Sequence, residues 1–259
     1  MYAYAPCHML RAAVHATASR ESRRERQRAI AKRGGRGRGL PTENADFDAT
    51  IENIATTWDS PAAAALLHHL VAQAQPGRTE RGRTTALRGL ELLTQVEAHA
   101  QPMWAEAEVQ EAVLLAAAPE RGGLRAARRA RQALRVLANF AAAPGVRERM
   151  WRCDTTRKLL LRHAAATPAL VAELEHAAGA HKLTTDAVHE GRELALRTLA
   201  NLAAEEANRK AMWADTPTRM ALLGAAAATQ PASIQDEARR ALANLSADPS
   251  VRQSMGLAS

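Results

Sequence analysis

The chain has 259 residues and a formal net charge of +8, but residues 1–41 hold ten bases against two acids, so the other 25 bases and 25 acids balance. A neutral body does not favour a nucleic-acid-binding domain. Cys7 and Cys153 are the only cysteines, and no stretch forms an 18-residue apolar run or a secretory signal, which argues against a disulfide framework, a membrane span and export. We therefore expect an intracellular protein, cytoplasmic or nuclear, with no membrane partner.

Residues 1–41 form the first predicted segment, a basic N-terminal tail that ends in a Gly/Arg run at residues 34–39. A solvated, disordered extension is the plain interpretation of this composition. Two alternatives stay open: a patch for nuclear targeting or nucleic-acid contact, and an organelle transit peptide, because residues 1–20 hold no acid. A nucleic-acid-associated protein acting through this tail is accordingly the alternative function.

Residues 42–259 are predicted to form helical repeats, each with a long helix, a short helix and a second helix. The second helices follow breakers such as Asp215-Thr216-Pro217, because Pro suits the first turn of a helix. They are expected at Ala62–Ala72, Glu106–Ala118, Thr156–Ala166 and Thr218–Ala228.

Tryptophans mark the predicted short helices. They lie 46, 47 and 62 residues apart, and three of them follow a methionine; the residues are Trp58, Met103-Trp104, Met150-Trp151 and Met212-Trp213. We interpret the Met-Trp pairs as apolar core between repeats, since large apolar side chains supply most of the burial in an alanine-rich chain.

The predicted long helices share the phrase Leu-Ala-Asn-Phe/Leu, whose asparagines are Asn139, Asn201 and Asn244. Asn139 and Asn201 each precede a tryptophan by 12 residues, and Asn244 lies 43 residues beyond Asn201. A weaker copy, Ala86–Leu93, has Leu92 at the asparagine position. A period of about 40–47 residues is typical of a helical solenoid, which offers a long binding surface and rarely a catalytic pocket. We therefore expect neither an enzyme nor a bound cofactor.

One unit contains an insertion of about 19 residues within Thr167–Glu190, which we expect to emerge as a loop. It contains His176, His181 and His189, but not at the spacing of a metal site, so no metal is predicted. At the other end, Ser259 falls where a further second helix should begin, so the last repeat looks truncated.

The three asparagine phrases and the segments after them resemble armadillo repeats over roughly residues 42–259, with the phrases in the position of the third helix. The resemblance implies an all-α, right-handed solenoid of about four to five units. In that family the third helices line a concave groove, and the asparagine contacts the backbone of an extended peptide. Importin-alpha-like members carry Trp four residues before the asparagine. This chain has arginine there, which does not favour a nuclear-import receptor.

The candidate binding residues lie four apart on the predicted long helices and therefore share one side of each helix. They are Arg88, Arg135, Asn139, Arg197, Asn201, Arg240 and Asn244. An Asn amide offers a donor and an acceptor to a peptide bond, and an Arg offers a fork to a carboxylate or phosphate. We therefore predict a monomeric scaffold that binds an extended, acidic peptide or protein segment.

A purely structural role for the same residues is the competing interpretation. Glu193 and Asp236 stand four residues before Arg197 and Arg240 and would form helical ion pairs with them. Arg135 has no acid at that distance, which makes it the least encumbered cation in the set. The asparagines could equally tie neighbouring helices together without a ligand.

Overall fold

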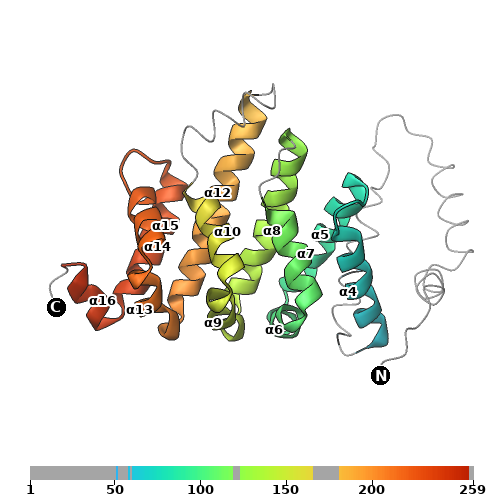
Figure 1. The fold of residues 1–259 in the computed structure, drawn as a ribbon, viewed down its shortest axis with the longest axis horizontal. Coiled ribbons are helices and arrows are strands. Elements are labelled where there is room, and N and C mark those ends of the chain that lie inside the picture. The colour runs from blue at the N-terminus through green and yellow to red at the C-terminus, as the bar shows by residue number, and fades with distance from the viewer. Residues whose placement is uncertain (1–50, 52–57, 59, 119–122, 166–180, 257–259) are drawn as a thin grey trace, which may run out of the picture. The chain divides into compact units, whose positions relative to one another are not determined.

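A computed structural model describes residues 51, 58, 60–118, 123–165 and 181–256 (Figure 1). The predicted tail at residues 1–41 lies outside these residues. The described residues form helices and contain no strand, so the all-α prediction is confirmed for them. Contacts divide the chain into two compact units, Met1–His69 and Leu70–Ser259, and the boundary falls inside the first described helix, α4 (Pro61–Ala74). The second unit contains everything discussed below.

The order of long, short and second helices follows the prediction. The long helices are α5 (Glu80–Thr94), α8 (Gly123–Ala142), α12 (His181–Ala204) and α15 (Ala232–Ser246). The short helices are α6 (Glu97–Ala105), α9 (Pro144–Arg152), α13 (Glu206–Ala214) and α16 (Pro249–Ser254). The second helices after them are α7 (Ala107–Ala117), α10 (Asp154–Ala164) and α14 (Thr216–Ala225).

The long helices of the second unit pack side by side in chain order, α5 on α8, α8 on α12 and α12 on α15 (Figure 1). The second helices do the same, because α10 contacts both α7 and α14. Leucines spaced three or four apart on the long helices point between these layers and are fully buried, as at Leu134 and Leu137. Burial of this apolar stripe holds each long helix in place.

Helix starts follow the local signals. Pro144 and Pro249 occupy first helical positions, and Asp215 accepts a hydrogen bond from the Thr218 backbone N–H at 3.0 Å at the start of α14. Both devices suit a helix N-terminus, where backbone donors lack partners within the helix. The breakers read from the sequence are therefore real helix boundaries.

Part of the predicted insertion loop is helical instead. Residues 181–190 form the first turns of α12, so the expectation of a loop is wrong there, while residues 166–180 lie outside the described residues. Residues 181–190 contain no Pro or Gly, and continuing the helix satisfies their backbone hydrogen bonds. Gly191 is buried, and a side chain there would start 3.5 Å from a methyl group of Leu134, so α12 approaches α8 closely at this point.

The Met-Trp pairs supply core as predicted, with one exception. Met103, Met150 and Met212 are fully buried, and so are Trp104 and Trp151 to within a few per cent. Trp104 packs against the ring of Phe140 in an edge-on arrangement, with ring centroids 5.1 Å apart. Trp213 is only half-buried, so core status does not extend to it.

The residue six positions after each of these tryptophans caps the C-terminal end of the short helix. Gln110, Arg157 and Arg219 donate side-chain hydrogen bonds to the backbone oxygens of Trp104, Trp151 and Trp213, at 2.6, 3.4 and 3.0 Å. The two arginines also lie over the indole rings, 5.3 and 5.5 Å from the ring centroids. A helix C-terminus has unsatisfied carbonyls, so this repeated contact caps it. The sequence pattern did not reveal this position.

Within the part of the chain that the structure describes, no helix is both long enough and apolar enough to cross a bilayer.

Replacing Trp151 with Ala should lower the free energy of unfolding by about 3 kcal/mol or more, because a fully packed indole leaves a cavity. Trp213→Ala should cost clearly less, because that ring is already partly exposed. Chemical denaturation of both variants, followed by circular dichroism, measures the difference. Equal losses for the two variants would contradict the burial pattern.

His163 makes stability depend on pH. Its Nε2 lies 2.8 Å from the backbone oxygen of Ala117, which joins α10 to α7. Burial is the main reason that the His163 pKa is lowered, with Arg162 adding to it, and the Ala117 hydrogen bond opposes the shift. The unfolded chain then binds a proton at a higher pH than the folded chain does, so stability falls as pH drops below about 6.5.

Thermal unfolding at pH 7.5 and pH 5 should accordingly give a lower Tm at the acidic pH. The variant His163→Gln keeps a donor but cannot titrate, and it should show a smaller change in Tm between the two conditions. His189→Gln, at an exposed position, is the matched control and should keep the wild-type change. An unaltered pH response in His163→Gln would remove His163 as its source.

Candidate functional site

The seven predicted binding residues lie on the four long helices, on the side away from the buried leucines. We call this set the ladder: Arg88 on α5, Arg135 and Asn139 on α8, Arg197 and Asn201 on α12, and Arg240 and Asn244 on α15. All seven are partly or fully exposed, whereas leucines on the opposite side of α5, α8 and α12 are buried. Consecutive long helices are in contact, so the structure brings the ladder together.

Each ladder asparagine is bonded to the long helix before it. The Asn201 amide nitrogen donates to the Ala138 oxygen at 3.3 Å, and that of Asn244 donates to the Ala200 oxygen at 2.8 Å. Asn139 donates in the same way to the Glu91 oxygen at 3.3 Å, and also to the Thr94 hydroxyl at 3.2 Å. The acceptor is in every case the residue just before the equivalent ladder position on the preceding helix. The asparagines therefore do tie neighbouring helices together.

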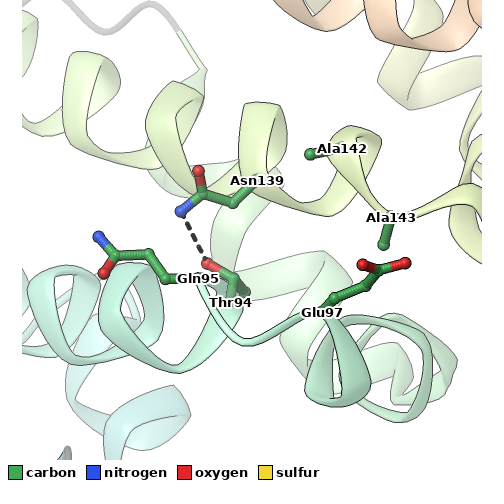
Figure 2. A pocket seen from close by; sticks show the side chains of 6 residues that line it. All are labelled: Thr94, Gln95, Glu97, Asn139, Ala142 and Ala143. Carbon is green, nitrogen blue, oxygen red and sulfur yellow. Dashed lines mark hydrogen bonds between the residues drawn. The ribbon is translucent and has the colours of Figure 1, made fainter.

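These bonds also fix the direction of the three amides. With the nitrogen held against the preceding helix, the amide oxygen turns away from it, as Figure 2 shows for Asn139. No hydrogen bond to any of the three amide oxygens occurs among the described residues. An Asn oxygen has two acceptor lone pairs, so the ladder keeps a row of oriented acceptors as well as its structural bonds.

Arg135 is not an unencumbered cation, and that expectation is wrong. It forms an ion pair with Glu190 of α12, and Arg131 binds the other oxygen of the same carboxylate at 2.7 Å. No acid stands four residues before Arg135 on its own helix, but one reaches it from the next long helix. Glu190 is 55 residues away and reaches Arg135 because α12 begins early and packs on α8.

Arg197 and Arg240 meet at one carboxylate, that of Glu237. Arg197 binds Glu193 at 2.8 Å, as predicted, and also Glu237 at 2.9 Å across the contact between α12 and α15. Arg240 lies 2.7 Å from the other oxygen of Glu237, so the expected pair with Asp236 is wrong. Asp236 instead lies 3.9 Å from Arg239, because it is turned away from α12 while Glu237 faces it.

Arg88 pairs with Glu91 at 3.2 Å on α5, and the amide of Gln132 on α8 binds the same carboxylate oxygen. Glu91, Glu190 and Glu237 thus contact ladder arginines, and the sequence interpretation did not include them. Gln132 and Glu237 both stand seven residues before a ladder asparagine, and that shared position is the signal that could have found two of these contacts.

A pocket of about 280 Å³ opens beside Asn139, where α5 and α8 end (Figure 2). Its lining residues are Thr94, Gln95, Glu97, Asn139, Ala142 and Ala143. The two alanines leave room that a larger side chain would fill, and Glu97 brings a carboxylate to the rim. The pocket is open, and polar side chains and alanines line it together, so it suits part of an extended chain better than an enclosed small molecule.

Among the described residues there is no group of three or more His, Cys, Asp or Glu side chains placed to hold a metal ion. His176 and the side chain of His181 lie outside that part of the chain.

No protein-family model matches this chain, and no curated protein matches it. One solved structure with some similarity is the crystal structure of an engineered protein, which shares 18% identity with a TM-score of 0.38 over 80% of this chain and 93% of that chain. A similarity of this size supports no argument about fold or function.

The asparagine bonds predict a cost in stability. Asn201→Ala should lower the free energy of unfolding by about 1 kcal/mol, because the hydrogen bond to Ala138 is lost. Asn201→Asp should cost more, since a carboxylate oxygen would then face the Ala138 oxygen. Urea denaturation of both variants checks the order. Wild-type stability in both would mean that the bond to α8 contributes nothing.

Proposed function

We propose that the second unit is part of an armadillo-type, right-handed solenoid of about four to five units and that the protein is an interaction scaffold. Its ligand is an extended segment of a partner protein, bound across the ladder. The observation that carries the proposal is the row of oriented asparagines on successive, contacting long helices. The repeat period and the order of long, short and second helices support it as well.

The spacing of the row fits an extended chain. Packed helices lie about 8–10 Å apart, which is about three residues of a strand at 3.3 Å per residue. One asparagine oxygen would then meet a backbone N–H of the ligand roughly every third residue. Such contacts to the backbone supply affinity without reading the ligand's sequence.

The ladder arginines supply a preference for acidic segments. Their ion pairs are half-exposed, with Arg197 and Arg240 retaining 43% and 46% of their side-chain surface. A guanidinium has five N–H donors, so a ligand carboxylate can bind beside the internal one. The internal carboxylates moderate this preference, which makes the backbone contacts the common element of binding.

Titration of labelled peptides tests the proposal. The double variant Asn201→Ala/Asn244→Ala should weaken binding of an acidic dodecapeptide and of its glutamine counterpart alike, by about tenfold, because two backbone contacts are lost. Gln253→Ala removes an exposed amide from α16 and should change nothing. Circular dichroism at the assay temperature confirms that each variant is folded. Unchanged binding in the double variant would refute the ladder as the site.

The alternative function, a nucleic-acid-associated protein, rests on the eight surplus positive charges of residues 1–41. Removal of residues 1–41 separates the two proposals, because it would abolish binding through the tail and leave binding to the ladder intact.

A further inference from the structure

Helix α8 carries a row of arginines that extends beyond the ladder. Arg125, Arg128, Arg131 and Arg135 follow at intervals of three, three and four residues and continue to Asn139. Residues three or four apart share one side of a helix, so the row lies on the side that carries the ladder. At 1.5 Å per residue it covers about 15 Å of the helix. We call these four residues the basic ridge.

The basic ridge has more positive charge than its surroundings neutralise. Arg125 and Arg128 are exposed, and no carboxylate of the described residues pairs with either of them. Arg131 and Arg135 share the single carboxylate of Glu190. Among the described side chains, the four cations of α8 therefore have one paired anion, Glu190 of α12.

The ladder arginines of the next two long helices are balanced by carboxylates. On α12 and α15 the carboxylates of Glu193 and Glu237 face the guanidinium groups of Arg197 and Arg240. Among the described side chains, α8 thus carries unpaired positive charge that the ladder positions of α12 and α15 do not, although the body of the chain is neutral as a whole.

This distribution selects the kind of partner. A nucleic acid carries a negative charge on every nucleotide. If it crossed the ladder, its phosphates would lie near the carboxylates of Glu193 and Glu237 as well as near the ridge, and the carboxylates would repel them. A protein segment can concentrate its charge at one end. It can therefore place acidic residues on α8 and uncharged residues on α12 and α15.

We propose that the basic ridge is the subsite for an acidic cluster in the bound protein segment, and that Glu190 is the internal carboxylate that limits its charge. This inference rests on the proposed function. It assigns the recognition of charge to α8 and leaves contact with the ligand backbone to the asparagines.

Fluorescence titrations with the full chain test the subsite, since the tail is then the same in every variant. The probes are a dodecapeptide with four glutamates at one end and uncharged residues after them, its glutamine counterpart, and a single-stranded DNA dodecamer. The variant Arg125→Gln/Arg128→Gln should weaken the acidic peptide about fivefold, since each exposed charge pair contributes modestly. It should leave the glutamine peptide unchanged. The control Arg149→Gln/Arg162→Gln removes two exposed arginines from α9 and α10 and should have less than a twofold effect.

Glu190→Gln supplies a readout that damage to the fold could not imitate. It removes the shared partner of Arg131 and Arg135, and it should strengthen binding of the acidic peptide about threefold without changing the glutamine peptide.

Three results would overturn the subsite. The first is that the ridge and control variants weaken binding of the acidic peptide equally. The second is that the ridge variant weakens DNA binding as much as peptide binding. The third is that neither Glu190→Gln nor the ridge variant changes the affinity for the acidic peptide. If the ridge variants change nothing while the asparagine double variant still weakens both peptides, the ladder proposal stands and the ridge alone fails. Absence of binding by the wild-type chain to either peptide refutes both.

Discussion

The contact between one long helix and the next is the interaction on which the other features of the second unit depend. Leucines at helical spacing bury one side of each long helix, and the helices then lie side by side from α5 to α15. The helices lie so close that a Cβ atom at Gly191 of α12 would be 3.5 Å from Leu134 of α8. Only at such a distance can an asparagine amide reach a backbone oxygen on the preceding helix. Apolar burial thus sets the spacing at which the polar row forms.

The structural bond of each ladder asparagine does not compete with its proposed binding role. Each asparagine donates one amide N–H to a carbonyl oxygen of the preceding helix, and this hydrogen bond holds the amide in one orientation. An amide that is already oriented loses less entropy when it binds a ligand. A structural bond and a binding contact can therefore belong to the same side chain, and evidence for the first does not argue against the second.

The ladder arginines show why charge must be read in three dimensions. Partly exposed ion pairs contribute little to stability, so Glu190 matters mainly for the charge that it neutralises on the surface. Glu190 lies on the early turns of α12, within the segment that appeared to be an insertion. The helical extension delivers a carboxylate to α8, and with it sets the surplus of positive charge there.

The sequence by itself determined the helical class, the order of the helices and most of their boundaries. It could do so because leucine spacing, prolines and capping residues act within a few residues of chain. It also placed each ladder arginine and its asparagine on the same side of a helix, because residues four apart in a helix lie above one another. The three pairs are Arg135 and Asn139, Arg197 and Asn201, and Arg240 and Asn244. Tertiary structure alone decided which carboxylate each arginine meets and which carbonyl each asparagine binds. The partners of Arg135 and Asn201 lie 55 and 63 residues away, and contacts over such distances follow from how helices pack, which local sequence patterns do not encode.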